Sequence, residues 1–256
     1  MYQTLQYLKF LFTSTNHHGV HSPFIYDLIT KGLYANTAYE PYKQIKSYRK
    51  ALLSNSQKLN ITDLGAGSKH SQNKERSVNE LAKTSGSSLK RAKRLYRLVK
   101  YLKPRQILEL GTSLGIATQA MALGTKDAMI TSIEGCPSLS AFAKQQLDAF
   151  QIKNVQLKVG DFKDQIPVLN QQTWDLIFFD GNHQKEATLH YFEQLLPTAH
   201  NDTVFIFDDI YWSKAMTEAW NTMIQHPKVS VTVDTFHWGL VFFKKELTKE
   251  NFKIRM

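Results

Sequence analysis

The sequence has little cysteine, few acids for its bases and no long apolar run, and each shortage excludes a class of protein. Cys136 is the single cysteine of the 256 residues, so neither an intrachain disulfide framework nor a cysteine zinc site can form. This usage favours a reducing compartment, and we expect a cytoplasmic protein. No apolar stretch approaches the roughly 20 residues that a membrane span needs. Residues 1–12 lack the basic start and cleavage site of a signal peptide, which predicts none.

The shortage of acids gives the chain a formal net charge of +10. Such a balance leaves nucleic acid, an anionic surface or an acidic substrate open as the partner. Much of the excess lies in residues 89–103, whose apolar residues repeat at helical spacing and leave the basic residues on the opposite face. Ser87 or Ser88 can cap this helix, and Pro104 ends it. We expect a solvated helix face rather than a nucleic-acid groove.

The most informative stretch is 106–118, where a short apolar run ends in a glycine turn and a helix begins. The run is short enough for a strand that is covered on both faces. Gly111 permits a turn that a side chain would block, and Gly115 lets the following helix approach the strand closely. The helix N-terminus offers free N–H groups to a polar or anionic ligand. The sequence therefore predicts a ligand cradle at a strand's carboxyl end.

The residues of the cradle select among ligands. Ser113 stands where a dinucleotide fingerprint needs its pyrophosphate glycine, which disfavours an NAD-dependent oxidoreductase. Glu109 precedes the first glycine and would suit a cation. Glu134 closes the next apolar run, at the position where an acid binds ribose hydroxyls. This combination suits S-adenosylmethionine, whose ammonium and sulfonium groups are positively charged.

Strands and helices then alternate along the chain. After the run that ends at Leu110, strands are predicted at 128–133, 155–159, 174–179 and 203–207, and an antiparallel hairpin at 229–236 and 240–244. Helices are predicted at 116–123, 137–150, around 189–196, and at 213–225. We therefore predict an α/β, Rossmann-like fold. Its seven-stranded, mostly parallel sheet would carry a C-terminal antiparallel hairpin, and a mainly helical N-terminal extension would precede it.

Four segments in this order resemble class I S-adenosylmethionine-dependent methyltransferases, closest to the catechol O-methyltransferase-like group. They are 109–115, Glu134, 160–162 and 180–183, and the resemblance covers about residues 88–245. It implies a methyltransferase domain over 87–256 and methyl transfer to a hydroxyl of a small-molecule acceptor. The implied cofactor-binding residues are Glu109, Leu110, Gly111, Thr112, Ser113, Gly115, Glu134, Gly135, Asp161, Phe162 and Asp180.

Within that set, the resemblance implies separate roles. Gly111, Thr112, Ser113 and Gly115 would hold the methionine end of the cofactor. Glu134 would bind the ribose hydroxyls. Asp161 and Phe162 would lie against the adenine.

The resemblance also implies a metal site and a base. Asp180, Asp208 and Asp209 follow two strands and correspond to the ligands of a divalent cation such as Mg²⁺. Asp209 replaces the Asn of the family pattern and adds negative charge, which leaves the metal open. His183 stands where the family has a basic Lys, three residues after Asp180, and histidine is a suitable general base. The alternative is a loop histidine at a helix start.

Other functions remain open at this level. The basic charge keeps an RNA methyltransferase acting on a ribose or a hydroxyl-nucleoside in view, and a cofactor-binding protein without turnover is a third hypothesis. The Asn/Asp-Pro-Pro-Tyr/Phe signature of base N-methylation is absent at 180–183. Trp212 and Trp238 are either acceptor-pocket or core residues. The sequence does not fix the acceptor or the oligomeric state, and a homodimer is one option.

Residues 1–86 are predicted to be an extension that caps the active site. Leu5, Leu8 and Phe12 fit the apolar face of a short helix, and a second helix fits 25–34. His17, His18 and His21 lie between them in a loop. We expect this loop to fold over the active-site mouth, with His18 or His21 touching the substrate, although its histidines would equally suit capping or packing.

A second glycine motif, 63–68, copies the methyltransferase motif by letters. It lacks both an apolar strand before it and an apolar helix face after it. We therefore interpret 63–86 as a polar loop.

Overall fold

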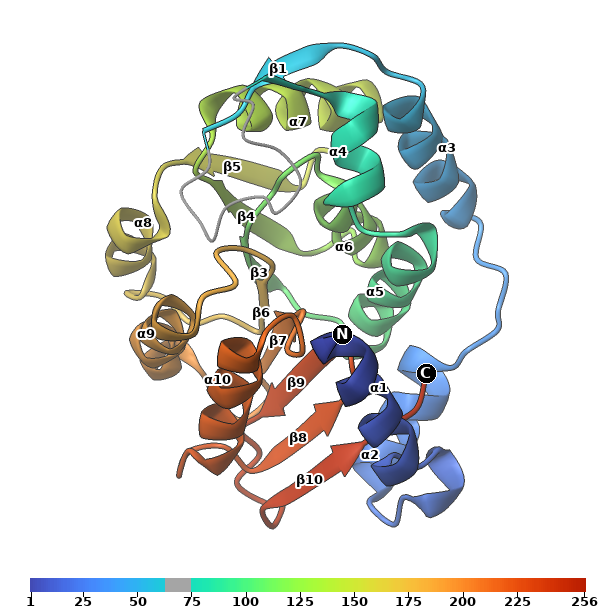
Figure 1. Ribbon diagram of the computed structural model, residues 1–256, viewed down its shortest axis with the longest axis vertical. Helices are drawn as coiled ribbons and strands as arrows, with labels where there is room; N and C mark the ends of the chain where they lie inside the picture. Colours follow the sequence, from blue (N-terminus) through green and yellow to red (C-terminus); the bar gives the residue numbers. More distant parts are fainter. Residues whose placement is uncertain (63–74) are drawn as a thin grey trace.

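The computed structural model describes residues 1–62 and 75–256, and its centre is an eight-stranded sheet (Figure 1). The strand order is β10-β8-β9-β7-β6-β3-β4-β5. The bounds are β3 (Gln106–Leu110), β4 (Met129–Glu134), β5 (Val155–Val159), β6 (Leu176–Phe179), β7 (Val204–Asp208), β8 (Val231–Asp234), β9 (Trp238–Phe242) and β10 (Glu250–Lys253). β9 alone is antiparallel to its neighbours within this sheet.

The predicted Rossmann-like, mostly parallel sheet with its C-terminal hairpin is confirmed, but the sheet has eight strands rather than seven. The missed strand is β10, which pairs in parallel with β8 at the edge. Only Phe252 of its four residues is buried. A short edge strand with one apolar residue leaves no run or alternation in the sequence.

The sheet changes direction between β3 and β6. From β3 the chain adds β4 and β5 on one side, and it then returns to add β6 and β7 on the other. Ligands bind outside the carboxyl ends of parallel strands at such a switch point. The residues that follow β3 and β6 here are Gly111 and Asp180.

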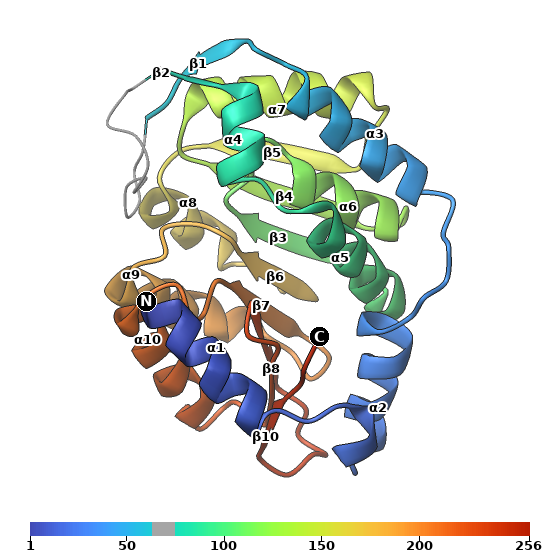
Figure 2. The ribbon, with the colours of Figure 1, turned by 45° about the vertical axis from the view of Figure 1, so that its right-hand side comes forward.

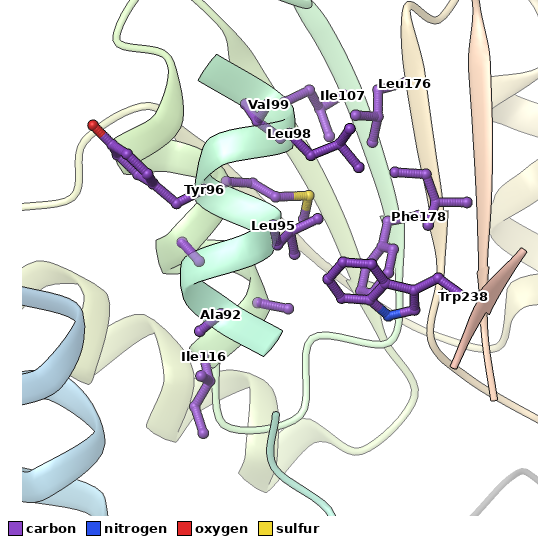
Figure 3. Packing of buried hydrophobic residues seen from close by; sticks show 14 of the residues in the cluster. Ala92, Leu95, Tyr96, Leu98, Val99, Ile107, Ile116, Leu176, Phe178 and Trp238 are labelled. Atoms are coloured by element: carbon purple, nitrogen blue, oxygen red, sulfur yellow. The ribbon is translucent and has the colours of Figure 1, made fainter. Parts of the chain in front are cut away.

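Helices cover both faces of the sheet. One face carries α5 (Leu89–Leu102), α6 (Ile116–Gly124) and α7 (Pro137–Ala149), and the other carries α8 (Phe162–Leu169), α9 (Lys185–Leu195) and α10 (Lys214–Gln225). Figure 3 shows the apolar side of α5 against residues of β3, β6 and β9, among them Ile107, Phe178 and Trp238. Each large apolar side chain buried in this way stabilises the fold by roughly 1.5–3 kcal/mol. The packing fixes α5 firmly on the sheet.

The predicted basic helix is present, but its polar face is not simply solvated. Ser88 caps α5 by accepting from the Arg91 N–H (3.3 Å), and Lys103, at φ 51°, ends the helix before Pro104. The Arg97 guanidinium donates to the carbonyl of Leu33 (2.6 Å). Arg91 is paired with acids, as described below. The prediction of a solvated face is therefore wrong for these two arginines, whose partners lie far away in the sequence.

Most of the segment before α5 packs against the α5–α7 layer, whereas its first helix lies beside α10 and the C-terminal strands (Figure 2). Its elements are α1 (Tyr2–Thr13), η1 (His17–Gly19), α2 (Pro23–Asp27), the π-helical η2 (Leu28–Leu33), α3 (Tyr42–Leu53), β1 (Lys58–Asn60), β2 (Glu75–Ser77) and α4 (Val78–Thr84). Ile25, Leu28 and Ile45 are fully buried in the same hydrophobic cluster as the sheet. The described part of 1–86 thus shares its core with the rest of the chain.

Two sequence interpretations of this segment need correction. Within the expected polar loop 63–86, β2 and α4 form, and Val78 and Leu81 of α4 are buried. α4 has only seven residues, which is too short for its apolar residues to show a helical repeat in the sequence. The glycine motif at 63–68 lies outside the described residues. In α1, Phe10 is buried whereas Leu8 is half exposed, so the helix docks through a different face from the one predicted.

No helix within 1–62 or 75–256 combines the length and the hydropathy needed to cross a bilayer.

Candidate active site

The loops that follow β3, β4 and β6 are bonded to one another. Asp180 donates its N–H to the Leu110 carbonyl (2.9 Å), and Ser113 donates its N–H to Glu134 Oε2 (2.8 Å). Gly111 has φ +108°, and a Cβ there would lie 2.3 Å from the Asp180 carbonyl oxygen. Only glycine therefore fits this turn. The glycine cradle, the predicted ribose acid and the β6 end form one unit.

Backbone strain gathers at the same edge of the sheet. Six described non-glycine residues have positive φ, and four of them follow strands of the sheet: Ser113, Asn182, Asp209 and Phe236. Such conformations cost about 1–3 kcal/mol each, and they cluster at functional sites. This points to the carboxyl edge of the sheet as the site.

Glu109 lies beneath the cradle and is fully buried. The hydroxyls of Thr118 and Ser132 donate to its Oε2, both at 2.5 Å, while Oε1 has no hydrogen-bond partner among the described residues. Burial, the largest cause, raises the pKa of Glu109 to about 8. The carboxyl group therefore favours its protonated form in the folded protein at neutral pH.

We expect this burial to make stability depend on pH through Glu109. Because the folded pKa is raised, the unfolded chain releases the proton first, and stability falls as pH rises from about 4.5 through about 8. Glu109→Gln cannot titrate. As pH rises over this range, the unfolding free energy of Glu109→Gln should increase relative to that of the wild type, by at most roughly 5 kcal/mol. Denaturant unfolding at several pH values measures the difference, with exposed Glu40→Gln as the control. Parallel curves for wild type and Glu109→Gln would contradict the expectation.

Other predicted cofactor residues have structural contacts of their own. Thr112 is buried, with its hydroxyl 2.5 Å from that of Ser132, and Leu110 belongs to the hydrophobic core. Asp161 caps α8 by accepting from the Lys163 N–H (3.0 Å). The Phe162 ring packs so closely on Gly181 that a Cβ there would lie 2.7 Å from it. Gly135 follows β4, next to Glu134. Their contacts with a cofactor stay predictions.

The three aspartates at the ends of β6 and β7 come together, as the strand order predicts. Asp208 is 4% exposed and lies close enough to Asp180 for each carboxyl to shift the pKa of the other. One terminal nitrogen of the Arg91 guanidinium lies 2.8 Å from Asp208 Oδ1 and 2.9 Å from Asp209 Oδ1. A cation from α5 thus bridges the cluster.

The pKa values of the buried pair follow from this crowding. Burial, and then the charge of Asp208, raise the pKa of Asp180 well above its ordinary range. Burial, and then the charge of Asp209, raise the pKa of Asp208 to about 6. The raised pKa of Asp180 favours its protonated form, in which it can donate a hydrogen bond to Asp208.

The aspartates therefore do not fit a divalent cation as they stand. Two of the carboxylates are already paired with the Arg91 guanidinium, and the raised pKa of the third favours its protonated form. Within the described residues, no group of three or more His, Cys, Asp or Glu side chains is placed to hold a metal ion. Arg91 lies 117 positions before Asp208, which is why the sequence did not reveal the pairing.

His183 lies beside this cluster. Its Nε2 is 3.9 Å from Asp180 Oδ1, too far for a hydrogen bond, and its ring centroid is 6.5 Å from that of Trp212. The histidine loop lies elsewhere, with the His17 ring packed against Tyr34 at 5.7 Å. The structure therefore supports the packing alternative for that loop. Trp238 is a core residue.

A cavity of about 510 Å³ opens beside the cluster. It is lined by α1, by the first turns of α5, by the loop after β7, by the β8–β9 turn and by the last residues of the chain. Trp212 belongs to this lining, whereas the histidines of 17–21 do not. Arg94, His237 and Arg255 also line the cavity, although no sequence motif marks them as site residues. His237 stays open to solvent, but partial desolvation and the charge of Arg91 lower its pKa.

A mostly parallel sheet whose reversed strand lies between β7 and β8, with a glycine cradle after β3 and acids at the strand ends, defines the class I S-adenosylmethionine-dependent methyltransferase fold. Residues 108–210 match the family model described as a methyltransferase domain. The chain therefore has the fold of this class, and its match to the methyltransferase domain lies within that fold.

Solved structures share the fold at low sequence identity. The O-methyltransferase from Bacillus cereus in complex with SAH is 18% identical, with a TM-score of 0.56, over 81% of this chain and 92% of that chain. Cofactor-bound Rv0187 from MTB is 18% identical, with a TM-score of 0.58, over 83% and 94%. The O-methyltransferase TomG from Streptomyces achromogenes in complex with SAM is 20% identical, with a TM-score of 0.55, over 63% and 82%. No protein of curated function matches the chain in sequence.

Proposed function

We propose that the chain transfers a methyl group from S-adenosylmethionine to a hydroxyl of a small molecule held in the cavity. The observation that carries the proposal is the position of the cavity, which borders Arg91 and Asp209 at the carboxyl edge of the sheet. Helix α1 encloses it, with Tyr7 and Phe10 in its lining and with the Tyr2 hydroxyl donating to Thr217 (2.9 Å). A cavity of about 510 Å³ has the size of a small-molecule site.

The cofactor would lie on the cradle. Gly111, Ser113 and the N-terminus of α6 would hold its methionine end. The unpartnered Oε1 of Glu109 would accept from its ammonium, whose positive charge would lower the pKa of the carboxyl and release its proton. Glu134 would take the ribose hydroxyls, and Phe162 would face the adenine. When bound, S-adenosylmethionine supplies the methyl group on a positively charged sulfur.

The remaining residues would position and deprotonate the acceptor. Positioning contributes much of the rate in such a reaction. His183 would accept the hydroxyl proton, because it lies beside Asp180 and next to the cavity residue Trp212. Arg91 would hold Asp208 and Asp209 in place without a metal ion. A metal-independent reaction is part of the proposal.

The first test of the function is binding and turnover by the purified protein. Calorimetry should detect S-adenosylhomocysteine and not NAD. Mass spectrometry should detect methylation within a panel of hydroxylated small molecules incubated with S-adenosylmethionine. Binding of NAD without S-adenosylhomocysteine would refute the proposal. Binding of S-adenosylhomocysteine without any methylated product would favour a cofactor-binding protein.

In the same assay, His183→Ala should lower turnover by roughly 10²–10⁴-fold and leave S-adenosylhomocysteine affinity unchanged. The loss should shrink at high pH, where the acceptor hydroxyl ionises without help. His190→Ala, an exposed histidine of α9, is the control. If His183→Ala keeps full turnover while His237→Ala loses it, the base is His237.

A further inference from the structure

The cavity has an unusual balance of charge. Lys90, Arg91, Arg94 and Arg255 line it, against a single lining acid, Asp209. Arg91 is already paired with Asp208 and Asp209. The positive charge of the other three side chains is therefore not balanced within the cavity.

Those three cations have no carboxylate partner in the described parts of the chain. Within 1–62 and 75–256, no Asp or Glu oxygen lies within 4.0 Å of Lys90, Arg94 or Arg255. Among the described residues, the Arg255 guanidinium donates only to a backbone carbonyl, that of Ser14 (3.0 Å). Arg94 is partly buried, and burial together with the charges of Arg97 and Arg91 lowers its pKa. A half-buried guanidinium beside other cations is a costly arrangement unless an anion binds to it.

The backbone adds to this field. Ser88, the N-cap of α5, and Lys90 in its first turn line the cavity, so the N-terminal end of a 14-residue helix opens into it. Helix N-termini favour anions through their dipole and their free N–H groups. Two independent features, unpaired side chains and a helix end, therefore favour the same kind of ligand.

We propose that the methyl acceptor carries an anionic group, a carboxylate or a phosphate, which binds in this cavity to Arg94, Arg255 and Lys90. The proposal rests on the function proposed above and names the substrate class of that site. Arg94 lies one helical turn, roughly 4.5 Å along the axis, beyond Arg91. Its anion would thus be held about one turn away from the Asp208–Asp209 end, where the hydroxyl would react.

Part of the cavity lining is aromatic. The Tyr211 and Phe236 rings are stacked at 4.9 Å, and Tyr7 meets Phe236 edge-on at 4.8 Å. All three residues line the cavity. An acceptor with a flat apolar body between its hydroxyl and its anionic group would therefore fit this aromatic part of the cavity.

The test uses anions that need no turnover. Binding of benzoate, phenyl phosphate and neutral benzamide to the full chain is measured by calorimetry, with and without saturating S-adenosylhomocysteine. We expect at least one anion to bind at least roughly tenfold more tightly than benzamide. Which anion binds more tightly distinguishes a carboxylate from a phosphate. Arg94→Gln should weaken the binding of that anion by a similar factor and leave the affinity for S-adenosylhomocysteine unchanged. Lys126→Gln, which removes an exposed charge in the α6–β4 loop, is the matched control.

The outcomes separate this proposal from the proposed function. Anion binding that depends on Arg94 supports the acceptor class even if S-adenosylhomocysteine fails to bind, a result that would overturn the function alone. Equal binding of benzamide and the anions, absence of any binding, or no effect of Arg94→Gln would each overturn the anionic acceptor. Binding of bulk tRNA that is lost in Arg94→Gln, without binding of the small anions, would overturn it in favour of RNA.

Discussion

Replacing Arg91 with alanine should destabilise the fold and create a binding site for a divalent cation. The wild-type guanidinium forms ion pairs with two carboxylates, one of them only 4% exposed. Its removal leaves Asp208 and Asp209 close together and unpaired beside Asp180. Breaking a fully buried pair costs about 3–5 kcal/mol. Arg91 is 22% exposed, so we expect on the order of 2–3 kcal/mol.

The gain of metal binding follows from the same three carboxylates. Without the guanidinium, their oxygens resemble the ligands that Mg²⁺, Mn²⁺ and Ca²⁺ prefer. Added Mg²⁺ or Mn²⁺ should therefore raise the melting temperature of Arg91→Ala and leave that of the wild type unchanged. Lys90→Ala, which removes a neighbouring charge without such a partner, should show neither effect. Loss of wild-type methyl transfer on chelation, with recovery on adding Mg²⁺, would refute the metal-independent reaction.

Gly111→Ala should be the most damaging single-methyl change in the cradle. The backbone there has φ +108°, and the new Cβ would meet the Asp180 carbonyl at 2.3 Å. Neither atom can yield without moving the end of β3 or β6. The conformational strain and the clash together should cost at least about 3 kcal/mol.

The shift should also reach the ligand site. Moving the β6 end displaces Asp180 from Asp208, and moving the β3 end breaks the bond from Ser113 to Glu134. S-adenosylhomocysteine affinity should therefore fall with stability, as calorimetry and denaturant unfolding would show. In the control Gly32→Ala, the new Cβ meets only ordinary contacts of 3.5 Å or more, and we expect a change within about 1 kcal/mol. A Gly111→Ala variant as stable as Gly32→Ala would contradict this account.

The sequence predicted those parts of the molecule that repeat along the chain. Buried parallel strands such as β6 read as apolar runs, and their ends mark where Asp180 and Asp208 must converge. It did not predict β10, which has a single buried residue, Phe252. Tertiary contacts created by folding also escaped it.

Arg91 is the clearest example of such a contact. It belongs to a run of similar basic residues, and nothing local distinguishes it from Lys90 or Lys93. Its partners come close only because α5 packs across the sheet beside the end of β7. The sequence thus correctly predicted that the three aspartates lie next to one another. It did not reveal the guanidinium that joins two of them.

The pairing of Arg91 with Asp208 and Asp209 also bears on how the protein depends on its surroundings. A metal ion at this position would be shared with every other binder in solution, and its occupancy would follow supply and competition. A guanidinium joined covalently to α5 is present at one per molecule as soon as the chain folds. It cannot be diluted, chelated or exchanged for a wrong ion. In the proposed metal-independent reaction, the readiness of this centre would depend on synthesis and folding of the chain and not on the mineral composition of the medium.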